Sequence, residues 1–191
     1  MAQVVIFGVL DTAELAHYYL TNDSEHEVVA FTVHREFRTE DTFQDLPLVD
    51  FEDIVEKYPP SKFHLFAPMT GRNMNRLREK IYKEGKALGY DFITYVSSKA
   101  TVCDNKIGEN CFILEDNTLQ PFTTIGNNVV MWSGNHIGHH GVIKDHVFFT
   151  SHVVLSGHCE IESHCFFGVN ATIRDYTKLA CLLYTSPSPR D

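Results

Sequence analysis

A strict six-residue repeat of large apolar side chains runs through the second half of the sequence. Its members follow one another without an insertion: Ile107, Ile113, Leu119, Ile125, Met131, Ile137, Ile143, Phe149, Leu155, Ile161, Phe167 and Ile173. A period of six fits neither an α-helix, with about 3.6 residues per turn, nor an isolated amphipathic strand. It is typical of a β-solenoid, in which each hexapeptide forms a short strand and a turn, and three hexapeptides complete one triangular coil.

A second set of positions in the same repeat is small or β-branched. It lies four residues after each of the first eleven apolar members, at Cys111, Asn117, Thr123, Val129, Asn135, Gly141, Val147, Val153, Cys159, Cys165 and Ala171. Such residues fit the cramped inner corner of a coil. Residues eighteen apart then stack on neighbouring coils at a spacing of about 4.8 Å. The pattern predicts at least four coils within residues 97–180.

The first half of the sequence lacks the six-residue repeat and has another pattern. Strand-like runs at 4–7, 27–33 and 63–67 alternate with helix-like stretches at 13–20 and 73–88. Asp11 to Glu14 has capping-box spacing before the first helix, and Asp50 is predicted to cap a short helix before Pro59. Strands that alternate with helices indicate a small parallel-sheet α/β domain over residues 1–96.

Composition and charge exclude several classes of protein. Acidic residues outnumber basic ones by 25 to 16, which disfavours binding to nucleic acid or an anionic membrane. No apolar run reaches the length of a bilayer span, and the N-terminus has no signal pattern, so we expect no membrane insertion and a cytoplasmic location. The five cysteines include no CxxC pair, which argues against a disulfide framework or a cysteine zinc site.

The last residues, 181–191, interrupt the repeat. The segment Cys181 to Asp191 back-translates onto the end of a widely used transposon-based sequencing adaptor. We therefore interpret it as a sequencing-adaptor artefact, with the natural sequence truncated near Ala180. The alternative is a genuine Ser/Pro-rich disordered tail.

An α/β domain followed by this repeat resembles the hexapeptide-repeat (left-handed β-helix) sugar O- and N-acyltransferases, which modify nucleotide-linked sugars for surface glycan synthesis. The resemblance covers residues 1–180. It implies a Rossmann-like N-terminal domain that holds the nucleotide-sugar, and a left-handed solenoid that holds acetyl-CoA, the co-substrate, between the subunits of a homotrimer. It implies no metal.

The resemblance also assigns roles to residues of the repeat. In this family the general base is a histidine followed by a carboxylate, and His139 stands at the position of the base. His140 replaces the carboxylate, so the group that orients the base is an open question for which Asn135 or His136 are candidates. Gly157 and Val169 match positions that contact CoA.

The N-terminal half carries the residues that match the family's sugar-nucleotide site. They are Gly8, Leu10, Asp11 and Thr12 in the turn after the first strand, and His34 at the end of the second strand. A turn between a strand and a helix N-terminus is suited to phosphate groups. Because the full GxGxxG pattern is missing, a dinucleotide-dependent reaction is poorly supported.

Five histidines are spaced six apart and leave a second function open. They are His140, His146, His152, His158 and His164. His140 would stack on His158, and His146 on His164, and such pairs could bind zinc as in the γ-class carbonic anhydrases, which share the solenoid. Exposed turn positions are the plainer interpretation. A metal-dependent hydratase is therefore one alternative, and a non-catalytic trimeric scaffold is the other.

Overall fold

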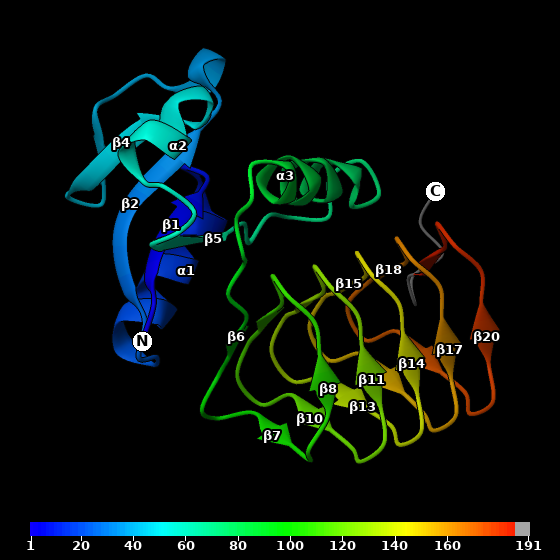
Figure 1. Ribbon diagram of the computed structural model, residues 1–191. Coiled ribbons are helices and arrows are strands. Elements are labelled where there is room, and N and C mark those ends of the chain that lie inside the picture. The colour runs from blue at the N-terminus through cyan, green and yellow to red at the C-terminus, as the bar shows by residue number, and fades with distance from the viewer. Residues whose placement is uncertain (186–191) are drawn as a thin grey trace. The chain divides into compact units, whose positions relative to one another are not determined.

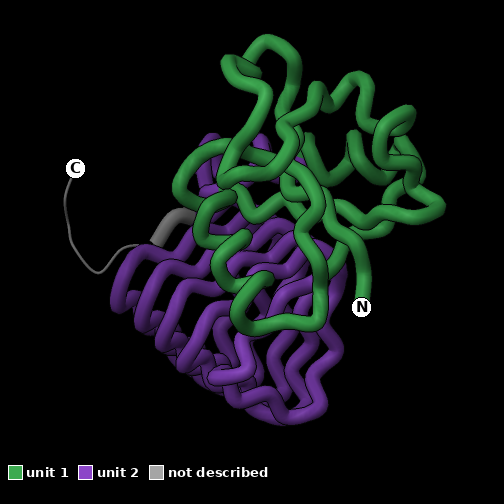
Figure 2. The backbone as a smooth tube through the Cα atoms, turned by 90° about the vertical axis from the view of Figure 1, so that its left-hand side faces the viewer, with its two compact units in different colours: residues 1–69, 80–93 green, residues 70–79, 94–191 purple. Residues whose placement is uncertain are grey.

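The computed structural model describes residues 1–185 and divides the chain into two compact units. Unit 1 consists of residues 1–69 and 80–93, and unit 2 of residues 70–79 and 94–191 (Figure 2). Residues 70–79, which the sequence placed in the N-terminal domain, thus group with the repeat. Residues 186–191 of the predicted adaptor tail lie outside the described residues.

Unit 1 is built on a five-stranded sheet with the order β3-β4-β2-β1-β5. The strands are β1 (Gln3–Phe7), β2 (Glu27–Val33), β3 (Thr42–Phe43), β4 (Leu46–Asp50) and β5 (Phe63–Phe66). Strands β1, β2, β4 and β5 pair in parallel, whereas β3 pairs antiparallel with β4. The α/β class is confirmed. The sheet is mixed, and a Rossmann-like fold is not confirmed by it.

The helices begin at residues other than those predicted, or without the predicted caps. They are α1 (Asp11–Asn22), η1 (Arg35–Phe37), η2 (Phe51–Asp53), α2 (Ile54–Lys57) and α3 (Arg76–Ala87). Helix α1 begins at Asp11, and its N-cap is Leu10 without a side-chain hydrogen bond, so the predicted capping box is wrong. Helix α3 begins at Arg76 because Asn73, Met74 and Asn75 have positive φ angles, which interrupt a right-handed helix.

Unit 2 is a parallel β-helix of three stacked sheets (Figure 1). The first sheet contains β7 (Thr101–Val102), β10 (Thr118–Leu119), β13 (His136–Ile137), β16 (Val154–Leu155) and β19 (Thr172–Ile173). The second contains β8 (Lys106–Ile107), β11 (Thr124–Ile125), β14 (Val142–Ile143), β17 (Glu160–Ile161) and β20 (Lys178–Leu179). The third contains β6 (Tyr95–Val96), β9 (Phe112–Ile113), β12 (Val130–Met131), β15 (Phe148–Phe149), β18 (Phe166–Phe167) and β21 (Tyr184–Thr185).

The register of these sheets confirms the predicted coil. His136 pairs with Thr118 on one side and with Val154 on the other, which are eighteen residues away in each direction. Five or six strands per sheet exceed the predicted minimum of four coils. The stacked parallel sheets fit a left-handed β-helix. Strand β21 pairs with β18, so the first residues of the predicted adaptor tail continue the winding.

The interior of the β-helix is filled by the two predicted sets of residues. Every sixth apolar side chain from Ile113 to Phe167 is buried, and the rings of Phe149 and Phe167 stack at 4.6 Å. At the inner corners, Asn135 donates from its amide nitrogen to Asn117 Oδ1 at 2.8 Å. Buried amides are thus paired with one another from coil to coil, as polar groups in an interior must be.

From the turn between β7 and β8 onward, each turn of the β-helix contains one residue in the left-handed backbone region. These residues recur every six positions and include Asn110, Asp116, Asn128, His140, His146, His152, His158, His164 and Asn170, with φ angles between 54° and 67°. Asparagine, aspartate and histidine are the side chains that adopt this region most readily after glycine. The six-residue spacing of the histidines therefore has a backbone cause that is independent of metal binding.

Residues 70–79 pack on one corner of the β-helix through buried polar contacts. The Arg78 guanidinium is fully buried and donates to the carbonyl oxygens of Asn128, His146 and Val147 at 3.2–3.3 Å. Asn75 donates to the carbonyl oxygen of Cys165 at 3.2 Å. Bonds to the backbone of successive coils fix this segment on the corner. Within residues 1–185, no helix is long and apolar enough to cross a membrane.

We expect the stability of unit 2 to fall between pH 6.5 and 4 through His146. Burial lowers the pKa of His146 to about 4, although Glu79 opposes the shift. Because an unfolded histidine titrates near 6.5, the unfolded chain binds more protons in this window. The stabilisation by neutral His146 is complete above about pH 6.5 and is lost as the pH falls towards 4.

After allowance for solvent screening, this change is about 2 kcal/mol. Urea unfolding of the wild type and of His146→Asn at both ends of the window measures it. Asparagine tolerates the positive φ of this position and does not titrate. Equal pH dependence in the two proteins would refute the assignment to His146.

Candidate active site

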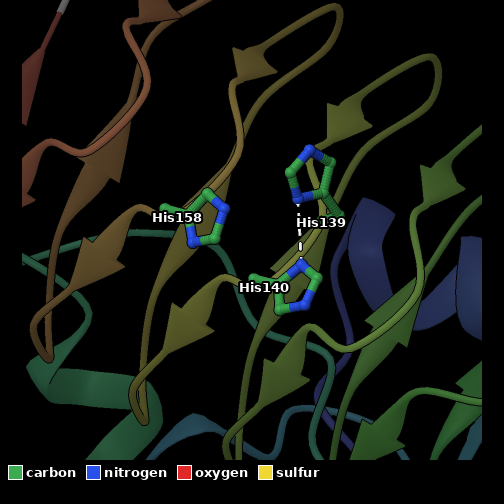
Figure 3. Close-up of side chains that lie close together, drawn as sticks. All are labelled: His139, His140 and His158. Atoms are coloured by element: carbon green, nitrogen blue, oxygen red, sulfur yellow. Dashed lines mark hydrogen bonds between the residues drawn. The ribbon is translucent and has the colours of Figure 1, made fainter.

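Three histidines meet at one corner of the β-helix. His139 and His140 lie in the turn between β13 and β14, and His158 lies in the corresponding turn of the next coil, between β16 and β17. All three are exposed, and one ring nitrogen of each lies within 4.8 Å of a ring nitrogen of the other two. The Nδ1 atoms of His139 and His140 are 3.0 Å apart and are joined by a hydrogen bond (Figure 3). The backbone amide of His139 donates to Gln120 Oε1 at 3.1 Å.

The ring of His139 packs against the backbone of Gly157 on the next coil. A Cβ atom built on Gly157 would lie 2.8 Å from Cε1 and 3.0 Å from Nε2 of His139. A side chain at residue 157 would therefore require the His139 ring to move, and glycine lets the imidazole approach the backbone this closely. The structure thus brings together His139 and Gly157, two residues that the resemblance assigned to a common site.

An aromatic column along the same corner supports His140. We use this name for Phe122, His140, His158 and Tyr176, which stack in this order at intervals of eighteen residues. The His140 and His158 rings are nearly parallel, with an interplanar angle of 15° and ring centroids 5.0 Å apart. The ring centroids of His158 and Tyr176 are 4.6 Å apart. The predicted stacking of His140 on His158 is confirmed. The sequence interpretation missed Phe122 and Tyr176, which the eighteen-residue spacing could have revealed.

Asn135 does not serve the role that was considered for it. Its side chain is buried in the interior, where Nδ2 donates to Asn117 Oδ1 and Oδ1 accepts from the backbone amide of Val153. Because these bonds occupy the amide inside the coil, Asn135 cannot orient His139, and that expectation is wrong. His136 lies on β13 and, within residues 1–185, forms no side-chain hydrogen bond to His139.

Val169 lies apart from the histidine corner. It is exposed in the turn between β18 and β19, at the start of a strand of the first sheet. His139 follows the end of β13 in the same sheet. Since the strands of this sheet are parallel, Val169 and His139 lie at its opposite edges. A role of Val169 in binding CoA stays a prediction.

In unit 1 the predicted sugar-nucleotide residues lie around the carboxyl ends of β1 and β2. Gly8 has a φ angle of 129° and donates to the carbonyl oxygen of Thr32. Leu10, Asp11 and Thr12 form the start of α1, where Leu10 and Asp11 are exposed and Thr12 is half-buried. The ring of His34 packs edge-on against Phe7, the last residue of β1, at 5.6 Å. The turn after β1 and the end of β2 are therefore neighbours, as the prediction requires.

His34 lies between two carboxylates that the sequence interpretation did not identify. Its Nδ1 is 3.0 Å from Glu52 Oε1, and its Nε2 is 3.2 Å from Glu84 Oε2. A depression of about 430 Å³ opens beside it, lined by His34, Arg35, Glu36, Glu52 and Lys80. The predicted substrate residue His34 is thus flanked by the carboxylates of Glu52 and Glu84.

Two groups of side chains lie close enough together to hold a metal ion, His139 with His140 and His158, and Glu79 with His146 and His164. In each group one ligand atom of every residue lies within 4.8 Å of the others. In the second group, Glu79 faces His146 and His164 at 3.7 and 3.0 Å. Asn128 Oδ1 accepts from Arg78, so its Nδ2 donates to His146 Nδ1, which leaves the His146 proton on Nε2 towards Glu79. A metal ion at this group would have to displace that proton, because an N–H nitrogen is not a metal ligand. The zinc alternative therefore stays a prediction.

The fold of this chain, an α/β unit and a β-helix, is shared by several solved structures. The acetyltransferase domain of PglB from Neisseria gonorrhoeae is 18% identical, with a TM-score of 0.79, and the alignment covers 93% of this chain and 85% of that one. The same domain has been solved with acetyl coenzyme A.

Two further structures show the same likeness. A single-residue variant of GDP-perosamine N-acetyltransferase from Caulobacter crescentus, in complex with CoA and GDP-perosamine, is 14% identical, with a TM-score of 0.70 and coverage of 96% and 93%. WeeI from Acinetobacter baumannii is 17% identical, with a TM-score of 0.70 and coverage of 91% and 81%. At these identities the likeness shows the fold. No family model matches the sequence, and no curated protein matches it either.

Proposed function

We propose that this chain transfers an acetyl group, or a close homologue, from acyl-CoA to an amine or hydroxyl of a nucleotide-linked sugar. The observation that carries the proposal is the position of His139, exposed on a coil corner with its ring against Gly157. The proposal is supported by the fold, which resembles acetyltransferases solved with acetyl coenzyme A or with CoA and GDP-perosamine.

In this reaction neutral His139 takes a proton from the acceptor as the acceptor attacks the thioester carbonyl. General-base help of this kind is worth about 10²- to 10⁴-fold in rate. Backbone amides around Gly157 stabilise the negative charge that develops on the carbonyl oxygen. CoA leaves as the thiol once the tetrahedral intermediate collapses. Direct attack needs no serine or cysteine nucleophile, and no metal ion takes part.

Unit 1 holds the nucleotide-sugar in this proposal. Its parallel strands have the order β4-β2-β1-β5, which corresponds to the first part of a doubly wound nucleotide-binding sheet. This order supports a Rossmann-like unit with Gly8, Leu10, Asp11, Thr12 and His34 at the substrate. We expect a nucleotide-sugar to slow amide hydrogen exchange in residues 8–14 and around His34. Exchange that the ligand leaves unchanged in these segments would contradict the substrate class.

The assay that tests the function measures the release of free CoA from acetyl-CoA with a panel of amino-sugar and deoxy-sugar nucleotides. Acceptor-dependent release supports the proposal. Elemental analysis of the purified protein addresses the alternative, because stoichiometric zinc would favour a hydratase. The homotrimer and the cytoplasmic location stay predictions, and sedimentation of an active monomer would refute the trimer.

Gly157→Ala is expected to lower CoA release by about 10- to 100-fold, because the new Cβ displaces the His139 ring from its position. Gly141→Ala is the matched control, since its Cβ would meet the Thr123 side chain at 3.3 Å and the Cys159 carbonyl oxygen at 3.5 Å, and not the His139 ring. Both variants are compared with the wild type by turnover and by thermal melting. Equal turnover in the two variants would show that the contact between His139 and Gly157 is dispensable.

A further inference from the structure

We propose that His140 is a positioning residue that accepts the Nδ1–H proton of His139 and thereby leaves Nε2 of His139 free to act as the base. The inference rests on the proposed function and assigns the orienting partner that this function needs. The observation behind it is the 3.0 Å contact between the two Nδ1 atoms, supported by the aromatic column.

The contact between the two Nδ1 atoms requires that one proton lies between them. Two bare nitrogens at 3.0 Å would repel each other, and two N–H groups would collide, so one Nδ1 donates and the other accepts. If His139 donates, neutral His139 has a bare Nε2 and can take a proton from the acceptor. If His140 donates, neutral His139 carries its own proton on Nε2 and cannot. Base catalysis therefore requires His140 in the Nε2–H tautomer.

The surroundings of His140 hold its ring in place for this role. The backbone at His140 is in the left-handed region, with φ of 55°, and its ring lies between Phe122 and His158. Tyr176 extends the column behind His158. Stacking on both faces restricts rotation of the imidazole, so its Nδ1 edge stays directed at His139. A carboxylate at this position would accept the same proton, and neutral imidazole replaces it.

A neutral imidazole that accepts a hydrogen bond, unlike a carboxylate, becomes a hydrogen-bond donor when it gains a proton. When His140 gains a proton, its Nδ1 becomes a donor, and His139 must then accept on Nδ1 and keep its proton on Nε2. A single proton on His140 thus switches off His139. Among residues 1–185 no carboxylate pairs with either ring, and the titratable groups that face them are each other and His158, with Tyr176 beyond it. Activity therefore requires both imidazoles to be neutral.

The test uses two substitutions that tolerate a positive φ angle. His140→Asn keeps an acceptor oxygen, whereas His140→Gly removes the acceptor and permits the same backbone. We expect His140→Gly to lower kcat by about 10- to 100-fold, the usual cost of losing an orienting partner, with KM for acetyl-CoA unchanged. His140→Asn retains most of kcat. Equal kcat in the glycine variant and the wild type would overturn the proposal.

The ring nitrogens supply an independent readout of the tautomer of His139. In ¹⁵N spectra of the wild type, His139, assigned by its loss in His139→Ala, should carry its proton on Nδ1. In His140→Gly the Nε2–H tautomer should appear.

The two proposals fail in different ways. A wild-type protein that releases no CoA with any acceptor refutes the function, while the ¹⁵N spectra still decide which ring donates. A wild-type protein that is active and carries its His139 proton on Nε2 refutes the role of His140 and leaves the function standing.

Discussion

His139→Ala is expected to reduce the rate of CoA release by at least about 10²-fold while the β-helix stays intact. His139 is exposed, and its ring contacts the outer surface of the coil, so its removal takes away the proposed base without opening a cavity. Turnover with saturating acetyl-CoA and acceptor measures the loss, and far-ultraviolet circular dichroism and thermal melting measure the fold.

His152→Ala is the matched control for this variant. His152 is a histidine of the repeat with a positive φ angle, but it lies in the turn between β15 and β16, at another corner of the coil. Its substitution should leave turnover close to that of the wild type. Near-normal activity of His139→Ala would remove His139 as the base and with it the mechanism proposed above.

Arg78→Met should destabilise the protein by about 3–5 kcal/mol and lower its melting temperature by about 10 °C. The Arg78 side chain is fully buried, donates to Asn128, His146, Val147, Asn75 and Thr70, and lies over the Phe148 ring. Methionine fills a similar volume but donates no hydrogen bond. Each buried acceptor that loses its partner costs about 1–3 kcal/mol.

Arg76→Met controls for the loss of a positive charge in the same helix. Arg76 is exposed two residues earlier, and a surface substitution of this kind usually changes stability by less than about 0.5 kcal/mol. If Arg78→Met does not fold, Arg78→Lys keeps the charge and part of the donor capacity, and its melting temperature should lie below that of the wild type. Equal melting temperatures for the Arg78 and Arg76 variants would refute the anchoring role.

The N-terminal unit shows where local sequence patterns are ambiguous. The strand from Glu27 to Val33 was predicted with its observed bounds because it is a continuous β-branched and apolar run. Strand β4 was missed: it contains Pro47, which weakens a strand pattern, and Asp50 was assigned to a helix cap. Pro47 is tolerated because it lies ahead of Leu48, where the parallel pairing with β2 begins.

The candidate site was predictable in part. His139 and Gly157 were identified by resemblance, and their eighteen-residue separation places them on adjacent coils. Asn135 was misjudged because a polar residue within a polar cluster suggests a site, whereas its place in the repeat is the inner corner. The partners of His34 were missed because Glu52 and Glu84 are distant in sequence and meet His34 only in the folded unit.

By itself the sequence determined the β-helix, because one apolar side chain in every six, repeated without an insertion, has a single way of reaching a common interior. The tertiary structure alone decided the burial of Arg78, the pairing of His139 with His140, and the left-handed backbone of the histidine turns. The physical reason is that the periodicity of apolar residues specifies which side chains are buried in the interior. The direction of each hydrogen bond and the environment of each charge depend on groups that neighbouring coils and distant segments bring together.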